Sequence, residues 1–392
     1  MDNPSVFSKN KLLIVTYVMT FLYALHYAIP VYATSSYLHS FFNSSMVSAT
    51  YLMGSVLALI VSMRVALSIK KFHTYNFTVG VAIFEMITLF LFGTTKLPIL
   101  LPVLFVAHFA LQTLLYVSLN IFIETFSKHS NIGSIRGIFL SILHIGILIS
   151  PLIAGFILKH FSFEVLYTVA SLTLLPYLYL VHAYLSHIKD PAYHTADMWS
   201  ALKDSLKNKN LRAAIVAKFM VECFYAVMVI YTPLYLTTLD IPLTTYLSFI
   251  IPIALIPLVL LPYELGRLAD TKYGEKEILL IGLLILIVIS FTCAMITSSS
   301  PYIWAFILFI SRVGASFVDT MSFTYYFKKI NKEDSSFTTL FVNMYTFGTI
   351  TVGGLGILIY PFIQERPELM FVILGLMLTY SVTLVLPMKD TR

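Results

Sequence analysis

Two sets of polar residues stand out because they interrupt long apolar stretches at helical spacing. The first set is Lys218, Glu222 and Tyr225, and the second is Arg312, Ser316 and Asp319. Both follow the spacing i, i+4, i+7, which puts the three side chains on one face of an α-helix. Ionisable side chains in the middle of an apolar helix are costly, and they point to a functional site. These residue types favour a carboxylate that exchanges a cation for a proton.

The four charges of these sets balance, and their pairing decides what they can do. We favour pairing across the two helices, because it neutralises all four charges: Lys218 meets Asp319, and Glu222 meets Arg312. A contact between Lys218 and Glu222 along one helix is the alternative. We expect one carboxylate, Glu222 first and Asp319 second, to trade its cation for a proton or a substrate contact during a cycle. A permanent structural ion pair is the competing interpretation.

A second polar set lies in the first half of the chain. It consists of Tyr23 and His26 in one apolar run and His108 and Gln112 in another. Because histidine titrates near neutral pH and can donate to a ligand, we place these residues on a substrate or proton pathway. A histidine that only hydrogen-bonds two helices is the alternative. Glu85 lies in a further apolar run, where we expect it to be protonated or bonded to a neighbour.

Membrane spans are the elements that must position these residues. Of the 392 residues, 58% are hydrophobic and only 11% are charged, which excludes a water-soluble protein. A helix crosses a bilayer in about 20 apolar residues. Twelve such runs lie near residues 11–33, 46–68, 75–95, 98–124, 137–159, 162–186, 211–236, 243–265, 277–298, 301–327, 337–361 and 368–388. Because they lack the alternation of barrel strands, the sequence predicts an all-α polytopic membrane protein.

The basic residues orient these spans. With the N-terminus in the cytoplasm, twenty of the 25 Lys and Arg residues fall on the cytoplasmic side. Lys96, Lys159 and Arg366 fall on the other side, and Lys218 and Arg312 lie within spans. Both termini are therefore predicted to be cytoplasmic, in a multi-pass protein of the inner or plasma membrane. The same distribution explains the net charge of +6 without a nucleic-acid partner.

The chain divides into two similar halves. An offset of 202 residues relates Tyr23 to Tyr225 and Gly146 to Gly348. We predict six-helix bundles over residues 1–186 and 211–392, joined by a cytoplasmic linker over 187–210. The linker forms either a short amphipathic helix or a solvated connection. Two parallel repeats are a transporter architecture with a substrate site at their interface.

Two further motifs carry a family resemblance. The connection after the eighth predicted span contains Gly266, Arg267, Asp270 and Gly274, and the fifth span contains Gly137, Gly146, Ser150, Pro151 and Gly155. The first pattern resembles the loop motif of the major facilitator superfamily, and the second resembles the helix motif of its drug–proton antiporter branch. The resemblance implies twelve helices whose first, fourth, seventh and tenth members line a central cavity.

These motifs also have physical roles of their own. The loop glycines permit a sharp turn, and Asp270 can accept hydrogen bonds from helix N-terminal amides, which would make a gating latch. Small residues in the fifth span allow close helix packing, and Pro151 kinks that span. Glu124 and Arg136 can pair near the cytoplasmic end of the fourth span, in a structural or gating role.

Together these features predict a secondary active transporter that works by alternating access. We expect proton coupling and export of a small molecule, with the chain acting as a monomer in the lipid bilayer. A proton symporter that imports a small polar metabolite is the alternative, and a membrane-embedded lipid-modifying enzyme is the alternative of another class. The sequence shows no phosphate loop and no zinc spacing around Cys223 and Cys293, so we expect no cofactor, metal or catalytic residue.

Overall fold

The described structure is helical throughout. The computed structural model describes residues 8–126, 132–187, 197–269, 273–330, 335–363 and 366–390. The chain divides into one compact unit of Met1–Thr34 with Met53–His194 and a second of Ser35–Leu52 with Thr195–Arg392. One of the boundaries between them, after Leu52, falls inside helix α3 (Ser44–Phe72). The all-α polytopic prediction is therefore confirmed.

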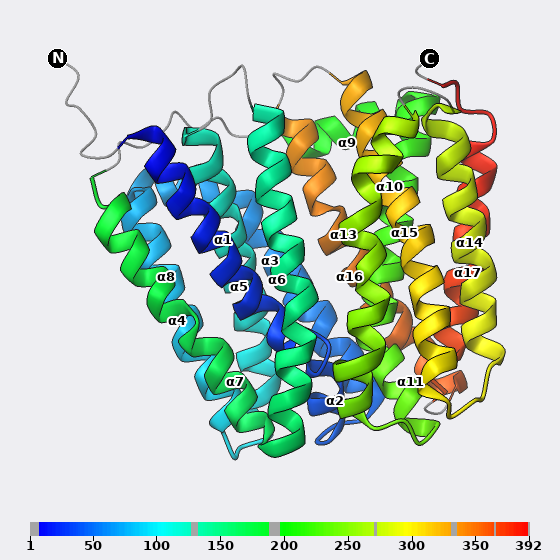
Figure 1. Cartoon of the computed structure of the whole chain (residues 1–392), viewed down its shortest axis with the longest axis horizontal. Helices are drawn as coiled ribbons and strands as arrows, with labels where there is room; N and C mark the ends of the chain where they lie inside the picture. The colour runs from blue at the N-terminus through cyan, green and yellow to red at the C-terminus, as the bar shows by residue number, and fades with distance from the viewer. Residues whose placement is uncertain are drawn as a thin grey trace. The chain divides into compact units, whose positions relative to one another are not determined.

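The first unit is a bundle built around α1. Its helices are α1 (Lys9–Val31), α4 (Thr74–Thr94), α5 (Leu100–Phe126), α6 (Ile132–His160), α7 (Phe163–Leu172), α8 (Leu174–Leu180) and the π-helical turn η2 (Val181–Leu185). Helix α1 packs along α6 and α5, while α4 packs along α5 and α7 (Figure 1). Buried apolar side chains such as Met19, Leu115 and Phe139 fill the space between these helices.

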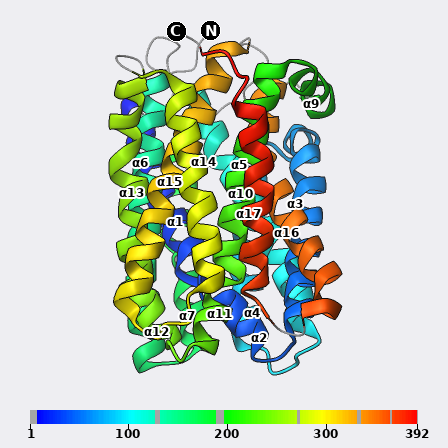
Figure 2. The same ribbon diagram turned by 90° about the vertical axis from the view of Figure 1, so that its right-hand side faces the viewer.

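The second unit is a bundle in which α10 and α15 lie side by side. Its helices are α2 (Thr34–His39), α9 (Met198–Lys207), α10 (Lys209–Ile230), α11 (Thr232–Thr238), α12 (Leu243–Thr245), the π-helical turn η3 (Tyr246–Ile250), α13 (Ile251–Leu268), α14 (Glu275–Met295), α15 (Pro301–Lys329), α16 (Ser335–Ile363) and α17 (Leu369–Val385). Helix α14 packs against α15 and α17, and α10 packs against α15, α16 and α17 (Figure 2).

The helices match the predicted spans closely. Eleven segments of the described chain are long and apolar enough to cross a membrane, and α17 is a shorter apolar helix in the position of the twelfth predicted span. The most buried segment contains α10, with 78% of its apolar window buried, followed by those containing α1 and α15 at 56% each. Three of the four helices expected around a central cavity are thus the most enclosed.

The linker region contains a helix rather than only a solvated connection. Asp197 caps α9 by accepting a hydrogen bond from the amide of Ser200 at 3.1 Å. Met198, Ala201 and Ser205 form the buried face of this helix, which packs against α16 and α10. The Ser205 hydroxyl lies 2.9 Å from the Tyr326 hydroxyl. The amphipathic pattern of the linker therefore attaches α9 to the second unit.

Glycines set the closest helix contacts, and the 202-residue offset relates two of them. A Cβ on Gly146 of α6 would overlap the Cβ of Ala24 on α1. A Cβ on Gly348 of α16 would lie 2.8 Å from the carbonyl carbon of Glu222 and 2.9 Å from the amide of Cys223 on α10. Equivalent glycines thus let equivalent helices touch in both units.

We predict that Gly282→Ala destabilises the protein whereas Gly80→Ala does not. A Cβ on Gly282 would lie 2.7 Å from the Cβ of Phe317, so α14 and α15 must separate, and overpacking of this kind costs about 1–3 kcal/mol. Gly80 has nothing within 4 Å of such a Cβ, and alanine is the better helix former. Thermal unfolding of the purified protein in detergent measures both. Equal melting temperatures for the two variants would contradict the packing argument.

Candidate functional site

A cluster of three charges lies between α10 and α15 in the second unit. The Nζ atom of Lys218 is 2.6 Å from Oε1 of Glu222 and 2.6 Å from Oδ1 of Asp319. The first contact runs along α10 and the second joins α10 to α15. The predicted pair of Lys218 with Asp319 is therefore present, and so is the alternative pair of Lys218 with Glu222.

One cation serves two carboxylates in this cluster. The side chains of Lys218 and Glu222 are 11% and 8% exposed, whereas that of Asp319 is 38% exposed. With all three groups ionised, the cluster carries one excess negative charge in a largely buried place, where charge is costly. One added proton would remove that excess.

Arg312 takes a different position from the predicted one. Its guanidinium carbon lies 5.1 Å from the ring centre of Phe224 and 5.6 Å from that of Tyr225. Its partner was expected to be Glu222, which contacts Lys218 instead. The reason is spacing, counted from the contact of Lys218 with Asp319. Glu222 is only one helical turn from Lys218 along α10, whereas Arg312 is seven residues, or about 10 Å, from Asp319 along α15. Glu222 and Arg312 therefore lie at different levels of the two helices.

A buried His–Glu–His network lies in the first unit, between α1, α4 and α5. The Oε1 atom of Glu85 is 2.9 Å from Nε2 of His26 and 2.5 Å from Nδ1 of His108. The other ring nitrogen of His26, Nδ1, lies 2.9 Å from the carbonyl oxygen of Ala170 on α7. The network thus ties four helices together.

The hydrogen bonds limit where the protons of this network can lie. A carbonyl oxygen only accepts, so Nδ1 of His26 carries a proton. One further proton must lie between Nε2 of His26 and Oε1 of Glu85, whichever atom holds it. The Oε2 atom of Glu85 is buried and has no hydrogen-bond partner. Two imidazoles and a carboxylate could also coordinate a transition metal. Here, however, one carboxylate oxygen is already hydrogen-bonded to both rings.

Glu85 is the member of this network that the sequence analysis did not place at a site. It was expected to be protonated or bonded to a neighbour, and it is bonded to two. The signal was present in the sequence: an isolated carboxylate within an apolar span needs partners, and two histidines in other spans were candidates.

Tyr23 and Gln112 lie on the same two helices as the histidines. The Tyr23 hydroxyl donates to the backbone carbonyl of Gln112 at 3.3 Å, and its ring stacks on those of Tyr27 and Tyr116. The side-chain oxygen of Gln112 is buried without a hydrogen-bond partner. The structure thus brings the four predicted residues of the first unit together along the contact of α1 with α5.

The loop motif lies at the junction of α13 and α14. Arg267 pairs with Glu264 at 2.6 Å on the surface, and Gly274 has a φ of 81°, which favours glycine. The amide of Glu275 donates to the carboxylate of Asp390 at 3.1 Å. The acceptor at the N-terminus of α14 is therefore Asp390, while Asp270 lies outside the described residues.

For the remaining predicted residues, the structure describes some side chains and leaves others undescribed. Ser150 donates to the carbonyl of Gly146 at 2.7 Å within α6, which also contains Pro151 and the buried Gly155. Glu124 lies in α5, and Arg136 and Gly137 lie in α6, but the side chains of Glu124 and Arg136 are outside the described part of the structure. The predicted contact of Glu124 with Arg136 therefore stays a prediction.

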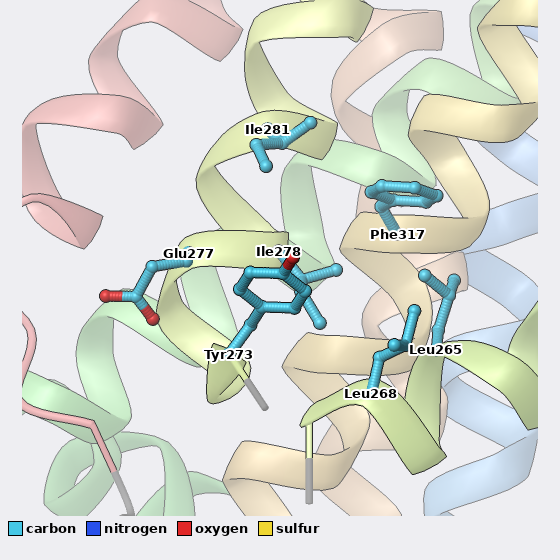
Figure 3. A pocket seen from close by; sticks show the side chains of 7 residues that line it. All are labelled: Leu265, Leu268, Tyr273, Glu277, Ile278, Ile281 and Phe317. Atoms are coloured by element: carbon cyan, nitrogen blue, oxygen red, sulfur yellow. The ribbon is translucent and has the colours of Figure 1, made fainter. Parts of the chain in front are cut away.

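A small surface pocket lies beside the loop motif. Its lining consists of Leu265, Leu268, Tyr273, Glu277, Ile278, Ile281 and Phe317, from α13, α14, α15 and the connection after α13 (Figure 3). Its volume is about 150 Å³, and the carboxylate of Glu277 points away from the apolar side chains. Because it offers little polar lining to orient a ligand, we do not place the substrate there.

We predict that Glu85→Ala lowers the melting temperature strongly and that Glu85→Gln lowers it less. The alanine variant leaves two buried ring nitrogens without their acceptor, which costs about 1–3 kcal/mol for each unsatisfied group. Glutamine keeps one acceptor oxygen. The matched control is Glu164→Gln, whose 3.4 Å contact with Lys96 is exposed and contributes little. An unchanged melting temperature for Glu85→Ala would show that the network does not stabilise the bundle.

Comparison with known proteins agrees with this architecture. A bacterial homologue of the human lysosomal transporter Spinster, inward-facing and occupied, has a TM-score of 0.74 at 10% identity, covering 99% of this chain and 97% of that one. The nucleoside transporter NupG has a TM-score of 0.75 at 15% identity, covering 96% and 98%. A variant of NupG reaches 0.77 at 12% identity, covering 97% and 100%. At these identities the likeness shows the fold.

The sequence itself gives the family. No curated protein matches the chain. The model of the Major Facilitator Superfamily matches residues 12–354, which is most of the chain. With the apolar helices described above, this makes the protein a multi-pass protein of the cell membrane and a secondary transporter rather than an enzyme. The chain belongs to the major facilitator superfamily.

Proposed function

We propose that this transporter couples the movement of a small molecule to that of protons. The observation that supports coupling most directly is the single ammonium group of Lys218 between the carboxylates of Glu222 and Asp319. The two carboxylates share one counter-ion, so together they carry one negative charge more than the ammonium group can balance. A proton on either one removes the excess charge, so the cluster is suited to bind and release a single proton.

The two carboxylates differ in ways that suggest different roles. Glu222 and Lys218 belong to the same helix, so their contact survives any rigid movement of α10. Asp319 belongs to α15, so a shift between α10 and α15 separates it from Lys218. Asp319 is also the more exposed carboxylate, at 38% against 8% for Glu222. We therefore assign proton exchange with water to Asp319, and the retention of Lys218 to Glu222.

The direction of transport has two candidate answers. The small residues and Pro151 of α6 resemble the antiporter motif, and they support export in exchange for protons. Charge balance in the second unit supports symport: Arg312 is a separate positive charge, so an anion and a proton can bind there together without a net change in charge. We propose that one copy of the chain is sufficient for transport, since it contains both compact units.

We predict that Asp319→Asn and Glu222→Gln each reduce substrate-driven proton movement about tenfold or more. Both substitutions keep the side-chain shape but leave Lys218 with a single carboxylate, so the excess negative charge that favours binding of a proton is gone. The assay uses purified protein in liposomes that contain a pH-sensitive dye. The added compounds are lipophilic cations, sugars, amino acids and nucleosides, the last because a similar fold belongs to a nucleoside transporter. The sign of the dye signal separates antiport from symport.

The matched controls are Asp204→Asn and Glu164→Gln, whose contacts with Lys207 and Lys96 are exposed. These variants should move protons at the wild-type rate. Normal rates and normal pH dependence in both Asp319→Asn and Glu222→Gln would contradict coupling at this cluster. Loss of coupling in Glu222→Gln alone would reverse the roles that we assign to the two carboxylates.

A further inference from the structure

We infer that Arg312 and Ser316 bind an oxyanion, a carboxylate or phosphate group, of the transported molecule. This inference rests on the proposed transport function and gives its substrate a chemical class. The two residues lie one turn apart on α15, which packs against α10 and α14 in the second unit.

Arg312 is a buried cation without an anionic partner. Its side chain is 1% exposed, and its Nε and Nη1 atoms have no hydrogen-bond partner. Within the described residues it forms no salt bridge. Because a guanidinium group stays protonated in proteins, the group cannot lower its cost by losing its charge. A buried unpaired charge is strongly destabilising, so its presence calls for a partner that binds during the cycle.

The neighbouring rings compensate this charge only in part. The Phe224 and Tyr225 rings, 5.1 and 5.6 Å from the guanidinium carbon, attract the cation through their faces. They do not accept the hydrogen bonds that Nε and Nη1 can donate. These donors belong to a planar fork whose geometry matches the oxygens of a carboxylate or a phosphate.

Ser316 provides a second donor at the same place. Its hydroxyl is buried and has no hydrogen-bond partner. Other serines of α15 bond to their own helix: Ser311 donates to the carbonyl of Leu308, and Ser322 donates to that of Asp319. The two residues with unsatisfied donors lie one turn apart on one face of α15, where side chains are close enough to share an acceptor.

The carboxylates nearest along α10 and α15 are already engaged. Glu222 and Asp319 both contact Lys218, and Asp319 lies about 10 Å along α15 from Arg312. The acceptor for Arg312 must therefore come from outside this pair of helices. A substrate anion fits, because it would be present only during the part of the cycle in which the site is open.

The test compares Arg312→Met with the wild type by thermal unfolding in detergent, without any gradient. Methionine has a similar length and no charge, so without ligand it should raise the melting temperature by about 2–4 °C. Benzoate, succinate and phenyl phosphate are then added, with benzamide and succinamide as uncharged counterparts. At least one anion should stabilise the wild type and the control Arg366→Gln by about 2 °C or more, while the amides and the Arg312→Met variant show no effect.

A second measurement covers the case in which Arg312→Met does not fold. Phenylglyoxal modifies arginine, and mass spectrometry of the wild-type protein follows the peptide that contains Arg312. The stabilising anion should slow that modification severalfold while leaving Arg366 unprotected. Equal anion effects on wild type and Arg312→Met, no anion effect, or an Arg312→Met variant less stable than the unliganded wild type would overturn the inference. Because no proton movement is measured, failure of the coupling proposal would leave these results unchanged.

Discussion

A charge inside a lipid-embedded helical bundle has to find its counter-charge within that bundle, and this requirement shapes both units of the protein. In the first unit, the Glu85 carboxyl group is hydrogen-bonded to two imidazoles. In the second unit, Lys218 is held by two carboxylates. These networks decide which helix faces point inward, since the alternative is an unpaired charge in an apolar environment. Arg312 is an exception, because it is a buried cation that forms no salt bridge within the described residues.

The two networks differ in how they would respond to helix movement. The His26–Glu85–His108 network spans α1, α4 and α5, and it reaches α7 through Ala170, so any shift among these helices breaks a buried hydrogen bond. The Lys218 cluster has one contact within α10 and one between α10 and α15. It can lose the second contact while keeping the first. We therefore regard the first network as holding its four helices in fixed positions. In the second network, a movement between α10 and α15 costs less.

Much of this fold could be predicted because the bilayer imposes strong rules. Apolar runs of the right length became helices, and the predicted runs 75–95 and 98–124 correspond to the separate helices α4 and α5. The contact of Lys218 with Asp319 followed from two helical faces with opposite charges. The rotation of each helix about its own axis could not be read from spacing alone, so the choice between Arg312 and Lys218 as the partner of Glu222 stayed open and the aromatic surroundings of Arg312 were not predicted.

Contacts between the end of the chain and distant helices could not be predicted from the sequence for a different reason. The loop motif suggests Asp270 as an acceptor for helix amides, and this stays a prediction because Asp270 lies outside the described residues. The carboxylate next to Gly274 belongs to Asp390, more than a hundred residues further along. No local pattern links those positions. Only the packing of α17 against α14 brings them together.

Residues Lys389 and Asp390, which follow α17, therefore hold the ends of other helices in place. Asp390 accepts from the amide of Glu275, the carbonyl of Lys389 accepts from the Tyr325 hydroxyl at 2.6 Å, and the Lys389 amide donates to Asn210 at 3.0 Å. Two consecutive residues thereby connect three helix ends through hydrogen bonds. An experimenter who trims the chain before Lys389, or places a protease site there, would loosen the ends of α10, α14 and α15.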